Sequence, residues 1–151
     1  GYSRTQRPHQ RKEQVMDEHS FQKAFKAELE KWNVHCPSLV ASMFMAGMPD
    51  MLLNNKLGYT FYIENKFWRN SNPPKDAHAI QNLLKGPQIA VIKHTLWKRG
   101  IMCPIVAQIE NDPDMAAICY KDMMKIYPWR EFAKFLANIN GIAPFLELMS
   151  K

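Results

Sequence analysis

Three side chains in the first half of the chain have the types and order of a metal-assisted hydrolytic site. Asp50 follows a proline, and Glu64 and Lys66 come later in one Glu-Asn-Lys run. Mg²⁺ takes oxygen ligands, typically one or two protein carboxylates together with water and substrate phosphate oxygens. A lysine beside such a pair can orient or deprotonate a water, or offset charge on phosphorus. These residues therefore predict hydrolysis of a phosphate ester.

A β-hairpin is the element that must bring the two carboxylates together. The Asn54–Gly58 segment predicts a tight turn, because Asn and Gly tolerate positive φ. Its flanks, 51–53 and 59–63, are apolar and β-prone. Folding about this turn places position 50 opposite position 64, and strand alternation puts Glu64 and Lys66 on one side. The alternative is a surface hairpin on which Glu64 and Lys66 form an ordinary ion pair.

The spacing also carries a family resemblance. Gly47-Met48-Pro49-Asp50, followed by Glu64-Asn65-Lys66 on a strand, resembles the PD-(D/E)xK nuclease superfamily. Glu18 and Gln22, one turn apart in a predicted helix, and Gln88 in a later helix make the chain similar to its VRR-NUC branch. The resemblance covers roughly residues 18–109.

The resemblance implies a restriction-endonuclease-like α/β fold with an αβββαβ core, and a nuclease that depends on Mg²⁺ or Mn²⁺. The residues that it assigns to the metal are Asp50, Glu64, Glu18 and the main-chain carbonyl of Asn65. Lys66 would position or activate water, and Gln88 would lie near that water or the phosphate. Glu18 could instead be a solvated helix carboxylate, and Gln88 a polar residue at a helix N-terminus.

The rest of the chain predicts one domain over residues 13–151 after a flexible basic tail, 1–12. Hydrophobic periodicity, capping residues and breakers predict the following elements: a helix over 13–32, a strand over 39–44, a short helix from Asp76 to Leu84, a helix from Gly86 stopped by Gly100, and a strand over 101–109. Pro104 argues for an edge position or a bulge in that last strand. From about residue 111 we expect a helical appendage, with a turn over 111–114, an ambiguous stretch over 115–124, a helix over 128–137 and a short apolar tail over 145–149.

Charge points to a polyanionic partner. The net charge of +6 favours nucleic acid, although an ordinary basic protein is the simpler interpretation of charge alone. The candidate phosphate contacts are Arg4, Arg7, Arg11, Lys12, Arg69, Lys75, Lys93, Lys98 and Arg99. The three cysteines lack metal-ligand spacing and predict free thiols in a reducing compartment. Because no membrane-length apolar run or secretory signal is visible, we expect a cytoplasmic protein without a membrane partner.

Together these features predict a Mg²⁺-dependent endonuclease on DNA, selective for branched or junction structure because no base-reading motif is visible. The alternatives are a non-catalytic DNA-binding domain and an RNA endonuclease. One metal site cuts one strand, so we also expect a homodimer, which the resemblance to small junction-cutting enzymes supports. Apolar residues of 129–136 and 145–149 are its candidate interface; the alternative is a monomeric nicking enzyme whose C-terminal helix covers its own core.

Overall fold

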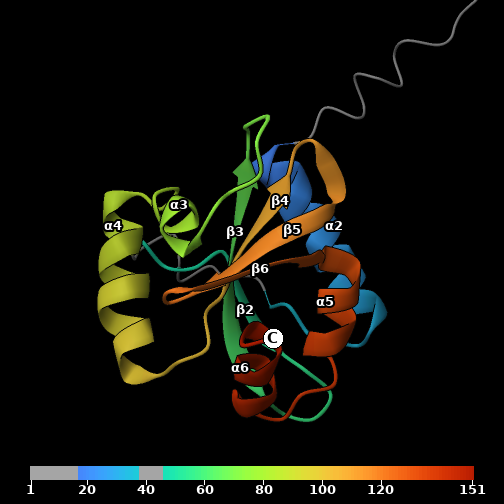
Figure 1. Ribbon diagram of the computed structural model, residues 1–151. Coiled ribbons are helices and arrows are strands. Elements are labelled where there is room, and N and C mark those ends of the chain that lie inside the picture. Colours follow the sequence, from blue (N-terminus) through green and yellow to red (C-terminus); the bar gives the residue numbers. More distant parts are fainter. Residues whose placement is uncertain (1–16, 38–45) are drawn as a thin grey trace, which may run out of the picture.

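A mixed five-stranded sheet forms the centre of the computed structural model, which describes residues 17–37 and 46–151 (Figure 1). Its strands are β2 (Met51–Asn54), β3 (Thr60–Trp68), β4 (Ile105–Ile109), β5 (Asp112–Tyr120) and β6 (Met123–Pro128). They lie in the order β2-β3-β4-β5-β6, and β3 and β4 are parallel while the other neighbours are antiparallel. The predicted α/β class is confirmed. The strand predicted over 39–44 lies outside the described residues.

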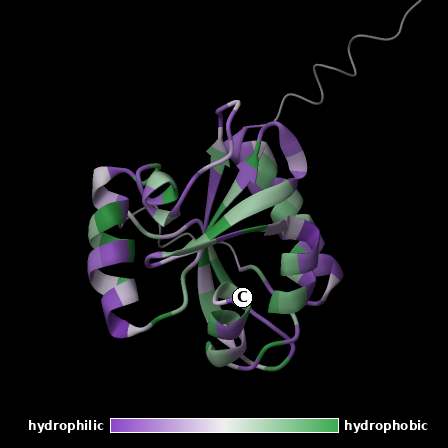
Figure 2. Ribbon diagram, in the orientation of Figure 1, coloured by the Kyte–Doolittle hydropathy of each residue, from purple (hydrophilic) through white to green (hydrophobic). Residues whose placement is uncertain are grey.

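Helices cover both faces of this sheet. They are α2 (Glu18–Lys31), α3 (Ala77–Gln81), α4 (Gly86–Gln88), η2 (Ile89–Leu96), η3 (Trp97–Arg99), α5 (Trp129–Leu136) and α6 (Ala143–Met149). Figure 1 shows α3 and α4 on one side of the sheet and α2 with α5 on the other. Hydrophobic residues are concentrated on the central strands, and the helices alternate between polar and apolar faces (Figure 2). Within the described residues, none of the helices has both the length and the apolar character that a bilayer crossing needs.

The predicted hairpin is confirmed. β2 pairs with β3 so that Met51 faces Ile63, which leaves position 50 opposite position 64. Asn55 holds the turn, because its side-chain oxygen accepts the backbone N–H groups of Leu57 and Tyr59 at 3.0 and 3.1 Å. Its Nδ2 atom donates to the carbonyls of residues 136 and 139, which ties the turn to the end of α5.

Helix α2 begins at Glu18, so the predicted helix is not continuous through Asp17, and its expected start at Glu13 lies outside the described residues. Asp17 has extended backbone angles and accepts the Ser20 N–H at 2.7 Å, which is the geometry of an N-cap. The predicted apolar stripe is confirmed, since Phe21 and Phe25 are fully buried. Phe21 packs edge-on against Trp129 at 5.3 Å between ring centroids, and this contact joins α2 to α5.

The predicted helices over 76–84 and 86–99 are both present. Asp76 caps α3 by accepting the Ala79 N–H at 3.0 Å, but α3 ends at Gln81 rather than Leu84. The later helix runs without a break from α4 through η2, which is π-wound, to η3. Gly100, at φ +72°, ends it as expected. Trp97 is buried and its indole donates to the Cys103 carbonyl at 2.8 Å, so it belongs to the core.

Of the two possibilities that Pro104 suggested for β4, the edge position is wrong, because β4 is the central strand. The register of β4 against β5 does shift, but between Gln108 and Ile109 rather than at the proline. Strand geometry starts at Ile105, one residue after the proline. The missing N–H of Pro104 breaks no ladder bond, and its carbonyl still accepts the Glu64 N–H at 3.1 Å. The carbonyl of Met102 similarly accepts the Tyr62 N–H at 3.0 Å, so the segment before β4 supports β3 along its length.

The helical appendage expected from residue 111 is also wrong in its first half. Residues 112–128 form the β5–β6 hairpin, which completes the sheet, and the turn expected over 111–114 is mostly strand. The helix expected over 128–137 is confirmed as α5. The side chains of Trp129, Phe132, Phe145 and Met149 are buried in the core of the same chain. These four side chains are therefore unavailable for the dimer interface that the sequence suggested.

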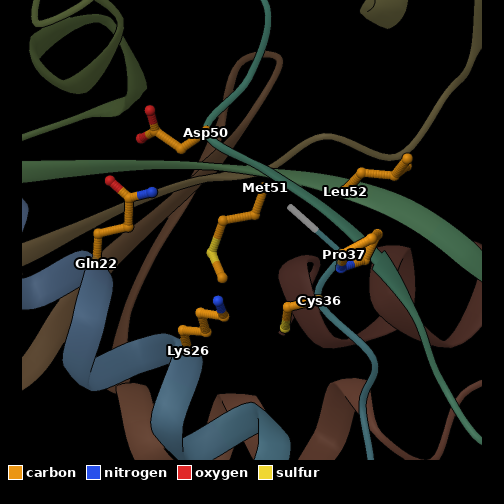
Figure 3. A pocket seen from close by; sticks show the side chains of 7 residues that line it. All are labelled: Gln22, Lys26, Cys36, Pro37, Asp50, Met51 and Leu52. Atoms are coloured by element: carbon orange, nitrogen blue, oxygen red, sulfur yellow. The ribbon is translucent and has the colours of Figure 1, made fainter. Parts of the chain in front are cut away.

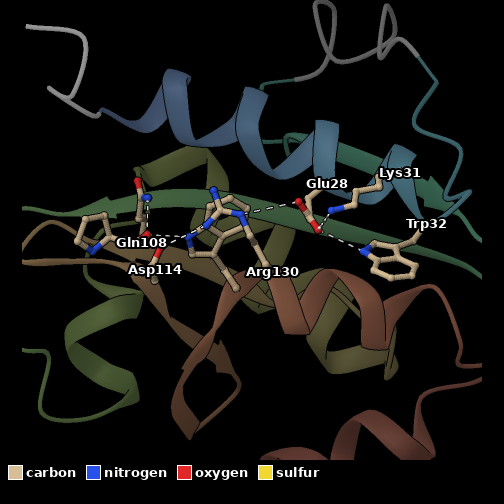
Figure 4. Close-up of polar contacts among 8 residues, drawn as sticks. Glu28, Lys31, Trp32, Gln108, Asp114 and Arg130 are labelled. Atoms are coloured by element: carbon tan, nitrogen blue, oxygen red, sulfur yellow. Dashed lines mark hydrogen bonds and ion pairs between the residues drawn. The ribbon is translucent and has the colours of Figure 1, made fainter. Parts of the chain in front are cut away.

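Arg130 ties three of these elements together at the surface (Figure 4). Its guanidinium lies 3.8 Å from Glu28 of α2 and 3.3 Å from Asp114 of β5. It also lies over the Trp129 ring, 4.2 Å from the centroid. Because all three contacts are partly exposed, each contributes little by itself, and their common effect is to fix how α2 and α5 meet.

Candidate metal centre

Asp50 and Glu64 are joined by two reciprocal hydrogen bonds at the point where β2 begins. The backbone N–H of Asp50 donates to Oε1 of Glu64 at 3.1 Å. The backbone N–H of Asn65 donates to Oδ2 of Asp50 at 2.9 Å. Each carboxylate is therefore held by the other strand's backbone, and the predicted convergence is confirmed. The ligand role expected for the Asn65 carbonyl stays a prediction.

Glu18 completes a cluster of three carboxylates. One oxygen each from Glu18, Asp50 and Glu64 lie within 4.8 Å of one another. Within the described part of the chain, β2 pairs with β3 only as far as Ile63, and Glu18 in the first turn of α2 reaches the β3 residues that follow. The Glu18 side chain is 46% exposed, which makes this the solvent-facing side of the cluster.

Lys66 lies against the same cluster. Its Nζ atom is 3.5 Å from Oε2 of Glu64 and 3.9 Å from Oε1 of Glu18, and its side chain is only 3% exposed. A buried ammonium is retained only where anionic partners offset its loss of hydration. The surface-hairpin alternative is therefore wrong, because both members of the Glu64–Lys66 pair are buried.

Gln88 reaches the cluster from α4. Its Nε2 atom donates to Oε2 of Glu64 at 2.9 Å, and its Oε1 atom accepts the Lys85 N–H at 3.0 Å. The second bond fixes the amide, so that its N–H groups point at the carboxylate. Gln88 is thus brought to the site as predicted, and it contacts a candidate metal ligand directly.

Gly47 lets the segment before Asp50 pack closely on the start of α4. Its φ of +89° lies in the left-handed region, and a Cβ atom there would come within 2.2 Å of the Pro87 carbonyl oxygen. Only glycine meets both requirements. The contact holds Asp50 and Gln88 at a fixed separation, which explains why the glycine belongs to the motif.

Burial and mutual repulsion dominate the electrostatics of the cluster. Burial, opposed by the Asn65 hydrogen bond, raises the pKa of Asp50 from 3.8 to about 6. Burial, followed by the charge of Asp50, raises the pKa of Glu64 from 4.5 to about 8, although Lys66 opposes the shift. Without another cation, the cluster therefore retains a proton at neutral pH.

The donor set fits a hard divalent cation. All three candidate ligands are carboxylates, and Mg²⁺, Ca²⁺ and Mn²⁺ prefer oxygen donors whereas softer metals prefer thiolate or imidazole. The predicted free thiols are confirmed, since Cys36, Cys103 and Cys119 form no disulfide bond with one another. The residues that would hold the cation are Asp50, Glu64 and Glu18.

A pocket of about 190 Å³ adjoins Asp50 on the α2 side (Figure 3). Asp50 and Gln22 line one part of it, and Lys26 and Cys36 line another. Lys26 was not among the predicted site residues. Its spacing could have indicated it, because Glu18, Gln22 and Lys26 recur every four residues and therefore share one face of α2.

The predicted phosphate contacts divide into two sets. Lys75, Lys98 and Arg99 are exposed, and Lys93 is half-buried. Arg69 is exposed as well, and its guanidinium lies 3.5 Å from Glu110. Arg4, Arg7, Arg11 and Lys12 lie outside the described residues. The described members of this predicted set thus lie on the loop after β3 and on the η2–η3 helix, outside the carboxylate cluster.

Comparisons of the chain with protein-family models, with curated proteins and with solved structures find no match.

Proposed function

We propose that the chain is a divalent-metal-dependent endonuclease with a restriction-endonuclease-like core, hydrolysing phosphodiester bonds in nucleic acid. One observation carries the proposal: three carboxylates from α2, the start of β2 and β3 meet within 4.8 Å, with the Lys66 ammonium 3.5 Å from one of them. Such an arrangement combines oxygen ligands for a cation with a positioned proton donor or acceptor, which is what hydrolysis of a phosphodiester needs.

Each residue has a role in this proposal. Asp50, Glu64 and Glu18 hold Mg²⁺ or Mn²⁺, which supplies Lewis-acid stabilisation of phosphate charge when bound. Lys66 orients a water molecule or donates to a phosphate oxygen, because its Nζ atom lies at the edge of the cluster. Gln88 keeps Glu64 in place through its hydrogen bond at 2.9 Å. Gly47 maintains the spacing between the two strands and α4.

The substrate class follows from charge. The chain carries +6, and the pocket beside Asp50 has Lys26 in its lining, so a polyanion can approach from the α2 side. Phosphate contacts of this kind carry no base information. We therefore favour recognition of nucleic-acid structure, with branched DNA as the first candidate and RNA as the second.

The competing function is a DNA-binding domain without chemistry. A binding surface gains nothing from burying two carboxylates side by side, because their repulsion and desolvation lower the stability of the fold. Locally unfavourable arrangements of this kind are expected at functional sites. The buried acids therefore favour the enzyme.

A cleavage panel tests the proposal. Linear duplex, flap, four-way junction and RNA substrates are incubated with the protein in Mg²⁺, Ca²⁺ or EDTA. We expect cleavage in Mg²⁺ only, and none by Asp50→Asn. Asp122→Asn is the matched control, because Asp122 is an exposed carboxylate in the turn between β5 and β6 and is not part of the cluster. Cleavage that persists in EDTA, or in Asp50→Asn, would show that another site does the chemistry.

A further inference from the structure

A second pocket lies at the far end of the strand that carries Glu64 and Lys66. Its volume is about 320 Å³, within the range of sites that bind small molecules. Trp68, the last residue of β3, forms one wall. The indole N–H donates to the Asn72 carbonyl at 2.7 Å, and this bond fixes the orientation of the ring.

The other walls are polar. Asn72 and Lys75 come from the loop after β3, and His78 and Asn82 come from α3 and its C-cap. Lys75, His78 and Asn82 are exposed, so their polar atoms are available to a ligand. With Asn70, the pocket thus combines an aromatic ring, three amides, an imidazole and an ammonium, and the Asp76 carboxylate also belongs to its lining.

The strand itself relates this pocket to the carboxylate cluster. Side chains alternate along a strand, so Glu64, Lys66 and Trp68 project from the same face of β3. Trp68 lies four positions after Glu64, which corresponds to roughly 13 Å along the strand at the usual rise per residue. Among the strands of the described residues, β2 pairs with β3 only as far as Ile63, so residues 64–68 of β3 are paired on one side alone, with β4. A nucleic-acid strand lying along this part of β3 would reach both sites.

We infer that the Trp68 pocket binds one unpaired nucleobase of the strand that is cut at the carboxylate cluster. The inference rests on the proposed nuclease function. An unpaired base offers a π face to the indole and a free hydrogen-bonding edge to the asparagine side chains, and Lys75 can meet the adjoining phosphate. A base inside a duplex is stacked on both faces and paired at its edge, so it does not fit. The pocket therefore explains a preference for flaps, gaps and junctions without any base-reading helix.

An abasic scan tests this inference. Flap substrates, each lacking one base in turn along the single-stranded arm and the branch point, are bound in Ca²⁺ and titrated by fluorescence anisotropy. For the unmodified protein we expect affinity to fall by about 5- to 150-fold at a single position, the loss that removal of one stacked base produces. Trp68→Leu should bind the intact substrate about 5- to 150-fold more weakly than the unmodified protein does. Its affinity should not depend on which base is missing, so its scan is flat. RNA and DNA arms of the same sequence show which sugar the pocket accepts.

Two further variants complete the design. Trp32→Leu is the matched control, because Trp32 is also half-buried and its indole N–H is also hydrogen-bonded, but it lies on the opposite side of the molecule beside Lys134. His78→Ala alters the pocket wall without changing β3. In this variant, removal of the base at the same position should cause a smaller loss of affinity than in the unmodified protein. A flat scan for the unmodified protein, or an unchanged position dependence in Trp68→Leu, would overturn the inference.

The two proposals fail separately. If the protein cleaves in Mg²⁺ but the scan is flat, the nuclease stands and the base pocket is wrong. If the scan shows the single position but no substrate is cleaved, the pocket stands as a binding site and the nuclease assignment is wrong.

Discussion

Lys66 is the residue whose environment differs most from that of an ordinary lysine. Its side chain is 3% exposed, yet it carries an ammonium between Glu64 and Glu18. Burial of such a group without partners costs several kcal/mol, and the two glutamates offset that loss of hydration. A purely structural position of this kind would usually hold an apolar side chain.

We predict that Lys66→Met abolishes cleavage while the fold persists. Methionine fills a similar volume in a buried site but carries no charge, so the loss reports the ammonium. Single-turnover cleavage should fall by about 10²–10⁴-fold, the usual contribution of one positioned proton-transfer or charge-stabilising group. Lys56→Met, in the exposed hairpin turn, should cut at the normal rate. Equal rates for the two variants would remove Lys66 from the proposed mechanism.

At the level of elements, the site depends on how the segment before β2 docks on α4. Gly47 meets the Pro87 carbonyl, and Gln88 follows directly and holds Glu64. The hairpin and the helix therefore position the carboxylates jointly. Either element alone would leave Asp50 or Glu64 without one of its supports.

Comparing Gly47→Ala with Gly58→Ala distinguishes the effect of this docking contact from the effect of backbone strain. Both glycines have positive φ, +89° and +84°, so both substitutions carry a left-handed penalty of about 1–2 kcal/mol. Only the Gly47 variant adds a clash, since nothing lies within 4 Å of a Cβ at Gly58. We expect Gly47→Ala to lose more stability in denaturant titration and most of its cleavage activity, and Gly58→Ala to lose stability alone. Equal effects on activity would contradict the docking role.

Local chemistry decided which elements could be predicted from the sequence. The β2–β3 hairpin could be predicted, because Asn and Gly mark its turn and its arms are apolar. The β5–β6 hairpin could not, because its turn contains Lys121 at φ +56°, a conformation that a lysine does not signal. The central position of β4 also escaped prediction, since Pro104 lies one residue before the strand rather than within it.

The site divides in the same way. Asp50, Glu64 and Lys66 could be predicted because a single hairpin brings them together. The approach of Glu18 and Gln88 depends on how two helices pack on the sheet, and their own neighbours in the sequence say little about it; only the family resemblance pointed to them. Neither pocket could be predicted, because each is lined by segments whose contact is set by tertiary packing.

For the molecule as a whole, a homodimer remains a proposal with a changed basis. Most apolar residues of α5 and α6 are buried within the chain. The exposed large hydrophobic side chains among the described residues are Leu57, Ile126 and Leu146, and Leu146 is the one that lies on α6. One metal centre still cuts one strand, so coordinated cutting needs two chains. We expect monomers in light scattering at micromolar concentration, and two chains per four-way junction when DNA is added. One chain per junction with both strands cut would refute pairing.

The stability of the whole fold should depend on the charge state of the carboxylate cluster. The pKa values of Asp50 and Glu64 rise on folding, from 3.8 to about 6 and from 4.5 to about 8. Between the unfolded and folded values the native state binds more protons than the unfolded state, so stability falls as pH rises through this window. The expected slope is about 1.4 kcal/mol per pH unit for each additional proton bound. Below about pH 4 both states are protonated and the effect disappears.

We therefore predict that the metal-free protein loses thermal stability between pH 5 and pH 8, and that Mg²⁺ restores it most at pH 8, where it no longer competes with protons for the carboxylates. A cation at one hundred times its Kd adds about 2.7 kcal/mol to the free energy of unfolding.

The Asp50→Asn variant tests the same conclusion, because it keeps the hydrogen bond from the Asn65 N–H but removes one charge. Without metal it should be more stable than the unmodified protein at pH 8, with a shallower pH dependence and a smaller response to Mg²⁺. Asp122→Asn should follow the unmodified protein throughout. These expectations can be checked by scanning calorimetry of all three proteins, with and without Mg²⁺. If the melting temperature of the metal-free protein rises from pH 5 to pH 8, the pKa values of the two carboxylates are not raised on folding.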